Sequence, residues 1–199
     1  MQSTLIWTGI EYYSLEHCLA QTGPDANLIN SVIVGVYEQK PYRVSYEITT
    51  DHMWRTMEVK LQSFHHNQHL IEVLTSDGKG NWKRNGEWAE AYEGCIDVDL
   101  PLTPFTNTLP IKRLKMVPGE EQLIKVIYLD VLANEFRVVN QQYRRVSEST
   151  YHYENIPNDF EADIAVDEAG FVENYPQLFK RTIKTGSNFR FNSSAPSEK

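Results

Sequence analysis

The sequence has few cysteines, no long apolar run and no signal peptide. Its two cysteines, Cys18 and Cys95, lie far apart without a CxxC pair, which argues against a disulfide scaffold or a cysteine zinc site and predicts two buried thiols. No apolar run approaches the roughly 20 residues that a membrane-spanning helix needs. The first residues lack the basic and apolar regions of a signal peptide. We therefore expect a cytoplasmic protein with no integral membrane association.

Basic residues are also too few for a nucleic-acid-binding protein. The 199 residues include 19 Lys and Arg against 27 Asp and Glu, a net charge of −8 at pH 7. A chain of this sign does not neutralise a phosphate backbone, so we expect no nucleic-acid partner. The hydrophobic content of 41% is enough for a packed core, and tyrosines (11) outnumber phenylalanines (8). This excess suits surfaces that are partly packed and partly wet.

Alternation of polar and apolar residues dominates the chain and predicts a sheet protein. In residues 41–51, Tyr42, Val44, Tyr46 and Ile48 form one apolar face of a half-buried strand. Residues 53–61 repeat the pattern, with Arg55 on the more apolar face, where its charge needs a partner. The pair Asn85-Gly86 predicts a hairpin, since it favours the type I′ turn. Further strands are expected at residues 70–74, 122–131, 135–146, 149–155, 160–166 and 171–175.

Helical periodicity is scarce, so we expect one helix and at most two. The candidates are residues 14–21, with Ser14 as N-cap, and residues 103–114. No linker or internal repeat interrupts residues 1–184, which we assign to a single domain. Residues 185–199 are polar and rich in serine, and we expect them to form a flexible tail.

Two groups of residues raise the question of metal binding or catalysis. His65, His66 and His69 form HHxxH, but this spacing places no clear pair on one strand face and favours a solvated turn. Asp97 and Asp99 lie on the same side of a strand, where they could hold a cation or act as acid and base. Structural pairing with Arg55 or Arg113 is the favoured alternative. No phosphate loop or GxSxG motif occurs, and we predict no catalytic residue, metal or cofactor.

The segment 94–114, GCIDVDLPLTPFTNTLPIKRL, is the most unusual stretch of the sequence. Thr106 and Asn107 stand among prolines, where hydroxyl and amide groups satisfy local backbone donors in a purely structural role. Beside Phe105, the same groups could instead grip a polar headgroup while apolar atoms contact an acyl chain. Arg113 suits a phosphate or carboxylate, or a salt bridge to Asp97.

This segment resembles the signature of a bacterial family named for glycolipid binding. The resemblance continues through further landmarks in the same order, from Trp7 to Arg181, including Asp51-His52-Met53-Trp54-Arg55-Thr56, Asp77-Gly78-Lys79-Gly80-Asn81-Trp82, Tyr151-His152-Tyr153-Glu154 and Tyr175-Pro176-Gln177-Leu178-Phe179-Lys180-Arg181. It implies a mainly β fold, a spiral β-roll in which a many-stranded antiparallel sheet curls around a single α-helix. It also allows a homodimer. Lys112 departs from the family pattern, in which arginine is more common, and this weakens the case for a clamp of two arginines.

The leading functional hypothesis is a non-enzymatic protein that holds a glycolipid or another amphipathic lipid within the curled sheet. The residues predicted to bind the ligand or to brace the helix are Trp54, Arg55, Asp97, Asp99, Thr106, Asn107 and Arg113. One alternative is a structural or dimeric interaction module without a ligand. Another is an enzyme acting on a sugar or lipid conjugate through Asp97 and Asp99, or through Glu16 and His17.

Overall fold

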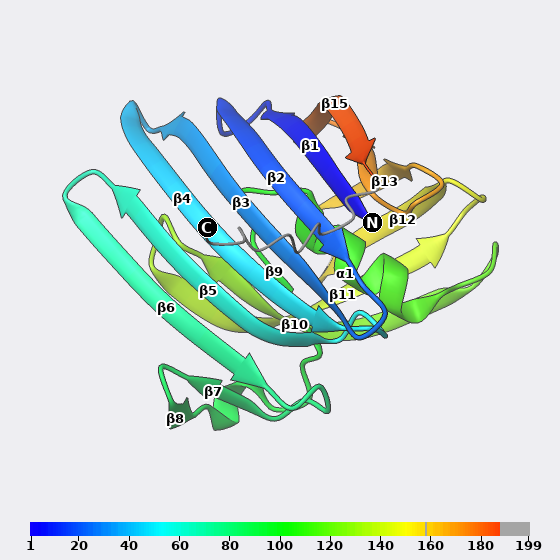
Figure 1. The fold of residues 1–199 in the computed structure, drawn as a ribbon, viewed down its shortest axis with the longest axis horizontal. Helices are drawn as coiled ribbons and strands as arrows, with labels where there is room; N and C mark the ends of the chain where they lie inside the picture. The colour runs from blue at the N-terminus through cyan, green and yellow to red at the C-terminus, as the bar shows by residue number, and fades with distance from the viewer. Residues whose placement is uncertain (158, 188–199) are drawn as a thin grey trace, which may run out of the picture.

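The computed structural model describes residues 1–157 and 159–187, in which one sheet of 15 strands curls around a single α-helix (Figure 1). The strands are β1 (Gln2–Gly9), β2 (Ser14–Thr22), β3 (Ala26–Tyr37), β4 (Lys40–Asp51), β5 (Thr56–His65), β6 (Gln68–Ser76), β7 (Trp82–Arg84), β8 (Glu87–Trp88), β9 (Asp97–Asp99), β10 (Glu121–Asp130), β11 (Glu135–Arg145), β12 (Thr150–Ile156), β13 (Glu161–Val166), β14 (Val172–Tyr175) and β15 (Phe179–Ser187). The helix is α1 (Phe105–Leu114), and a short 3₁₀ turn, η1, covers Glu90–Tyr92. This architecture confirms the predicted spiral β-roll.

The sheet is continuous because its first and last strands pair. Its order is β8-β7-β6-β5-β4-β3-β2-β1-β15-β14-β13-β12-β11-β10-β9, so β8 and β9 are the two edges. Neighbouring strands are antiparallel except β9 and β10, which are parallel. A parallel pair needs a crossover connection, and α1 lies in the connection between these two strands. The crossover places the helix on the inner face of the curl (Figure 1).

The helix is buried because both halves of the sheet turn apolar side chains toward it. Phe105 and Leu109 belong to a core cluster with residues of β1–β6, including Leu5 and Ile29. Ile111 belongs to a second cluster, which includes residues of β11–β15. Every helix residue from Phe105 to Ile111 is buried, polar ones included. The curled sheet therefore encloses a helix whose buried polar side chains pair inside the protein, except for the Thr108 hydroxyl, which has no partner among the described residues.

The prediction of a helix at residues 14–21 was wrong, because this segment forms β2. Its side chains alternate between the interior and the surface, with Glu16, Cys18 and Ala20 buried and His17 exposed. The strand pairs along its full length with β3 and over Ser14–Gln21 with β1, and this pairing outweighs the local helix propensity. Glu16 and His17 therefore point to opposite faces and cannot act as a catalytic pair.

The strand predicted for residues 53–61 begins later in the sequence than expected. Met53, Trp54 and Arg55 lie in the turn before β5, which starts at Thr56. Asp51 organises this turn, since its Oδ1 accepts hydrogen bonds from the backbone N–H groups of Met53 and Arg55. Arg55 is therefore not an inward-facing strand residue, as the alternation suggested.

Several other local expectations agree with the structure. Asn85 and Gly86 both have positive φ, 51° and 87°, as the type I′ turn of the β7–β8 hairpin requires. The predicted second helix is α1. No helix among the described residues has the length and apolar content needed to cross a bilayer. Strand β15 includes residues 185–187 of the expected tail, and residues 188–199 lie outside the described part of the chain.

A buried ion pair anchors the C-terminal end of α1 to the edge strand β9. Arg113 donates from Nε to Oδ1 and Oδ2 of Asp97 at 3.1 Å each, and from Nη2 to Oδ2 at 2.5 Å. Asp97 is fully buried, whereas the Arg113 side chain is 18% exposed. The carboxylate therefore depends on the guanidinium for its charge compensation. Of the two arginine partners considered from the sequence, the structure uses Arg113.

We predict that Arg113→Gln lowers the free energy of unfolding by about 3–5 kcal/mol, because it leaves the buried Asp97 carboxylate uncompensated. Urea denaturation at neutral pH measures this loss. The matched control is Glu135→Gln, which removes an exposed ion pair with Arg137 and should change stability by no more than about 1 kcal/mol. Equal effects of the two substitutions would contradict the assignment of Asp97 and Arg113 as a helix anchor.

Candidate functional site

A cavity of about 300 Å³ lies beside the N-terminal part of α1. Strands β9–β12, β14 and β15 supply half of its lining residues, and the turn between β1 and β2 contributes Glu11 and Tyr12. The remaining residues are Asp99, Pro101, Thr103, Asn107, Tyr128, Arg137, Val139, Tyr153, Asn155, Asp159, Phe160, Tyr175, Leu178 and Phe179. The cavity thus combines three carboxylates, one guanidinium and two amides with many aromatic rings.

Asp99 is one of three acidic residues that line this cavity, with Glu11 and Asp159, and it is held by neutral donors. Thr106 Oγ1 donates to Asp99 Oδ1 at 3.1 Å, and Gln141 Nε2 donates to Oδ2 at 2.6 Å. Burial raises the pKa of the Asp99 carboxyl, although both hydrogen bonds oppose this shift. Each carboxylate oxygen has a second lone pair, so Asp99 can accept further hydrogen bonds from a ligand.

Asn107 stands next to this carboxylate on the same helix as Thr106. Its Nδ2 donates to the hydroxyl of Tyr143 at 2.8 Å, and this hydroxyl lies 3.5 Å from Gln141 Oε1. Asn107, Tyr143 and Gln141 are all buried, and burial raises the pKa of Tyr143 well above its usual range. Asp99, Thr106 and Asn107, all predicted from the sequence, therefore belong to one hydrogen-bonded group, which we call the polar floor.

An aromatic wall faces the polar floor. Tyr153 is the centre of this wall, with ring centroids 5.3 Å from Tyr143, 6.2 Å from Phe160 and 6.1 Å from Tyr175. Phe179 continues it at 6.2 Å from Tyr175. Tyrosine presents an apolar ring and a polar hydroxyl, so such a wall can contact a molecule that is itself partly apolar and partly polar.

The other predicted site residues lie away from this cavity. Asp97 and Arg113 form the helix anchor, and Arg55 forms a salt bridge with Asp51, 2.6 Å between Nη2 and Oδ2. Trp54 is buried with positive φ, and its ring lies 4.9 Å from Lys112 Nζ. Trp54 thus contacts the helix that carries the polar floor without lining the cavity.

Most of the cavity wall was not predicted from the sequence. Tyr128, Tyr153 and Tyr175 line the cavity from three different strands, β10, β12 and β14, and Gln141 of β11 donates to Asp99 without lining it. Their only signal in the sequence was the tyrosine excess and its placement in predicted strands. Which tyrosines come into contact depends on the order of the strands in the sheet. The alternation of polar and apolar residues along the sequence does not reveal that order.

A second buried carboxyl connects to the cavity from the other half of the roll. Glu16 Oε1 accepts hydrogen bonds from Ser31 Oγ at 2.6 Å and Tyr46 OH at 2.7 Å. Tyr46 OH also lies 3.2 Å from Thr103 Oγ1, and Thr103 lines the cavity. Glu16 Oε2 has no hydrogen-bond partner among the described residues. Burial raises the pKa of Glu16 to about 7, despite the opposing hydrogen bonds from Ser31, Tyr46 and Thr103.

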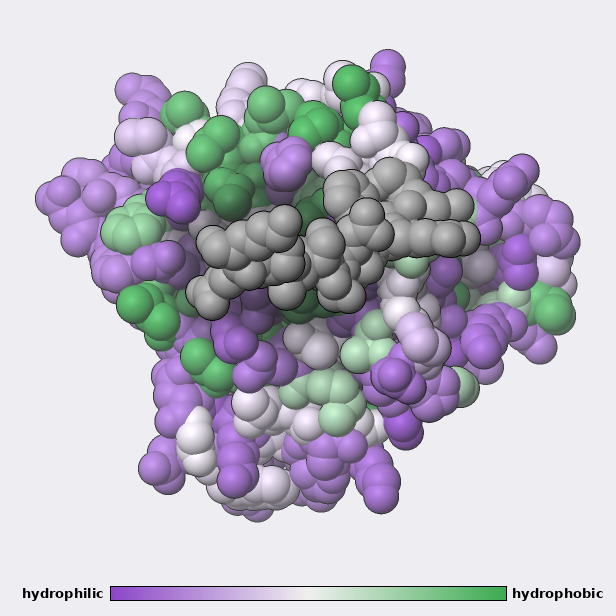
Figure 2. Space-filling model, in the orientation of Figure 1, coloured by the Kyte–Doolittle hydropathy of each residue, from purple (hydrophilic) through white to green (hydrophobic). Residues whose placement is uncertain are grey.

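A larger hollow of about 560 Å³ lies on the outer face of β2–β6. Its apolar lining includes Leu19, Val32 and Ile71. Figure 2 shows apolar side chains gathered on this face over β2 and β3, where Leu15 and Val34 form an exposed cross-strand pair. We place the candidate site in the inner cavity, because buried polar groups converge there.

The fold and site define a curled, unclosed β-sheet protein with an inner cavity beside a buried helix. The model of the family described as "Putative glycolipid-binding" matches residues 4–181. The chain belongs to this family. Among curated proteins, none matches this sequence.

Solved structures that resemble this fold include the following two. A DUF1089 family protein from Pseudomonas aeruginosa is 33% identical, with a TM-score of 0.77, over 83% of this chain and 91% of that chain. A beta-barrel-like protein of the DUF1849 domain family from Brucella abortus is 7% identical, with a TM-score of 0.50, over 94% of this chain and 98% of that chain. The second likeness concerns the fold alone.

We predict that Glu16 makes stability fall as the pH rises. The folded pKa of about 7 lies above the ordinary value of 4.5, so the folded protein retains a proton that the unfolded chain has lost. The stability that Glu16 contributes by keeping this proton is complete below the pKa of Glu16 in the unfolded chain. It disappears as the pH rises through the pKa of Glu16 in the folded protein. Relative to Glu16→Gln, the wild type should lose about 2–3 kcal/mol between pH 5 and pH 8.

Urea denaturation of both proteins at several pH values measures this difference. Glu87→Gln is the matched control, because Glu87 is exposed on β8 and should leave the pH dependence unchanged. Parallel pH profiles for wild type and Glu16→Gln would show that Glu16 ionises normally.

Proposed function

We propose that this protein binds the sugar headgroup of a glycolipid in the inner cavity. The observation that carries the proposal is that Asp99 and Asn107 of the polar floor line the same cavity as the aromatic wall. Thr106 holds the Asp99 carboxylate without lining the cavity itself. A sugar ring needs acceptors and donors for its hydroxyls and flat apolar surfaces for its C–H groups. A cavity lined by a small number of well-oriented polar groups and by aromatic rings supplies both.

The size and surroundings of the cavity fit a headgroup better than a whole lipid. About 300 Å³ is at the low end of ligand pockets. A neighbouring hollow of about 380 Å³ shares Tyr12 and Pro101 with the cavity. Its lining includes Leu102 and Leu132, which offer apolar contacts to the remainder of an amphipathic ligand.

The arrangement gives less support to hydrolysis by Asp97 and Asp99. Acid and base catalysis on a glycosidic bond requires two carboxyl groups that both reach the substrate. Asp97 is fully buried against Arg113 and does not line the cavity. Asp99 is the only one of the two that a ligand in the cavity could contact, and a binding role needs only one.

The proposal predicts that a single-sugar amphiphile binds and that Asp99→Asn weakens this binding at least tenfold. The loss follows because Asp99 would no longer accept charge-assisted hydrogen bonds from sugar hydroxyls. Calorimetric titration with octyl glucoside below its micelle concentration measures the affinity. Asp25→Asn, an exposed aspartate outside the cavity lining, is the control and should bind like the wild type.

A second probe separates sugar recognition from binding of the alkyl chain. An octyl polyoxyethylene ether has a chain of the same length and no sugar, so we expect it to bind much more weakly than octyl glucoside. Equal binding of both amphiphiles, or affinity that Asp99→Asn leaves unchanged, would contradict headgroup recognition in this cavity. Native mass spectrometry of gently purified protein should also detect a retained glycolipid.

A further inference from the structure

A histidine and three carboxylates form a square on the hairpin of β12 and β13. His152 pairs with Asp163 across the two strands, and Glu154 pairs with Glu161. Because side chains alternate along a strand, these four point away from the face on which Tyr153 meets the cavity. The square is therefore separate from the candidate site, and its chemistry is independent of the proposed function.

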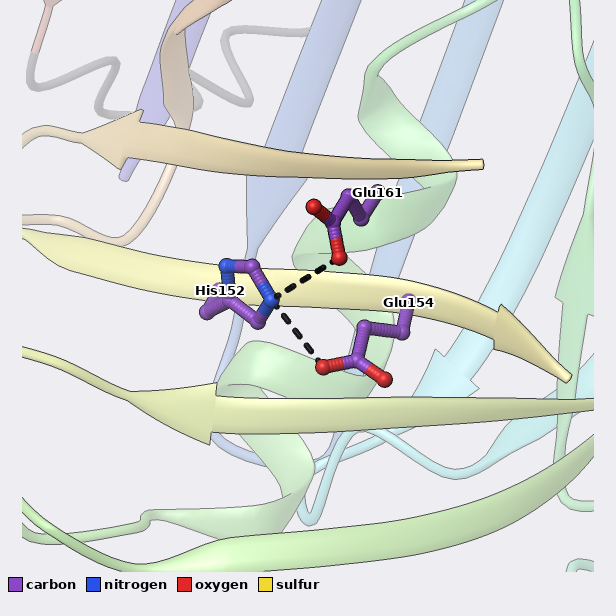
Figure 3. Close-up of side chains that lie close together, drawn as sticks. All are labelled: His152, Glu154 and Glu161. Atoms are coloured by element: carbon purple, nitrogen blue, oxygen red, sulfur yellow. Dashed lines mark hydrogen bonds and ion pairs between the residues drawn. The ribbon is translucent and has the colours of Figure 1, made fainter. Parts of the chain in front are cut away.

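The histidine is oriented so that one ring nitrogen faces two glutamates (Figure 3). His152 Nδ1 lies 2.8 Å from Asp163 Oδ1, and a carboxylate accepts only, so Nδ1 carries a hydrogen and donates. On the other side of the ring, Nε2 lies 3.0 Å from Glu154 Oε1 and 3.9 Å from Glu161 Oε2. Metal-binding histidines are commonly held in this way, with the nitrogen that does not bind the metal donating to a carboxylate.

The ligand atoms are spaced closely enough for one small cation. One atom each from His152, Glu154 and Glu161 lies within 4.8 Å of the other two. Ligands about 2.0–2.1 Å from a tetrahedral zinc ion are roughly 3.3 Å from one another. The 3.0 Å separation of Nε2 and Glu154 Oε1 is near this value, and the Glu161 side chain, 59% exposed, has room to move closer.

The charge of the square also favours a divalent cation. Three carboxylates surround one imidazole, which carries at most a single positive charge. The neighbouring strand β11 places Arg144 opposite His152, but its Nε lies 4.0 Å from Glu121 Oε2, so this cation is shared with another carboxylate. A divalent ion in place of the proton on Nε2 would balance two of the three negative charges.

We propose that His152, Glu154 and Glu161 bind Zn²⁺, with Asp163 as a positioning residue. An imidazole nitrogen with two carboxylate oxygens suits zinc, whereas Ca²⁺ and Mg²⁺ prefer oxygen ligands alone. Among the described residues, no other group of three such side chains has this spacing. The HHxxH motif does not form one, since His66 lies in the β5–β6 turn and His69 Nε2 is 3.1 Å from Gln62 Nε2.

Calorimetric titration of the metal-free full-length protein with Zn²⁺ tests this site. We expect one zinc ion per chain and a higher unfolding temperature when zinc is present. His152→Asn retains a donor toward Asp163 and removes Nε2, so it should abolish this binding. Glu161→Gln, at an exposed position, should weaken it at least tenfold without affecting folding, and Asp163→Asn should weaken it by about 10–100-fold.

The matched control is His66→Asn, which removes an exposed histidine from the other candidate motif. His66 has φ of 56°, a conformation that asparagine tolerates well, so the variant should fold and bind zinc like the wild type. The proposal is overturned if the wild type binds no zinc, or if His152→Asn and Glu161→Gln both bind it normally. Loss of zinc binding in His66→Asn alone would also overturn it, because the ion would then occupy the β5–β6 turn.

Discussion

The enclosure of α1 by a single sheet is the constraint on which the rest of this structure depends. Residues Phe105 to Ile111 of the helix are all buried, so polar side chains on it are stabilised by partners inside the protein rather than by water. Arg113 forms an ion pair with Asp97, Thr106 donates a hydrogen bond to Asp99, and Asn107 donates one to the hydroxyl of Tyr143. These contacts hold the helix in place, and the last two also fix Asp99 and Asn107, which line the cavity.

The same constraint gives two nearby carboxylates different roles. Asp97 and Asp99 are two residues apart on β9, yet only Asp97 meets a guanidinium. Asp99 is held by a hydroxyl and an amide, which are neutral and leave its charge available to a ligand. A short DxD sequence therefore contains one structural acid and one cavity acid, and their environments rather than their spacing distinguish them.

Local sequence signals predicted much of this fold but only part of the site. Alternation located most strands, and the proline-flanked segment before Arg113 located the helix together with Asp99, Thr106 and Asn107. The misassigned strand β2 shows the limit of such signals, since its conformation comes from pairing with β1 and β3. Tyr153 and Tyr175 meet for the same nonlocal reason. Their strands are separated by β13, so the curvature of the sheet brings the rings together.

The pairing of β1 with β15 has a consequence for how the chain folds. Residues 2–9 lie beside residues 179–187, so a contact that makes the sheet continuous spans almost the whole described sequence. Contacts of such long range are slow to form, because the loop between them must close first. During synthesis the hydrogen-bonding edge of β1 stays open until the last strand emerges, and an open edge can pair with another chain. Production of this protein at high concentration should therefore depend more on how quickly residues 179–187 arrive than on the final stability of the roll.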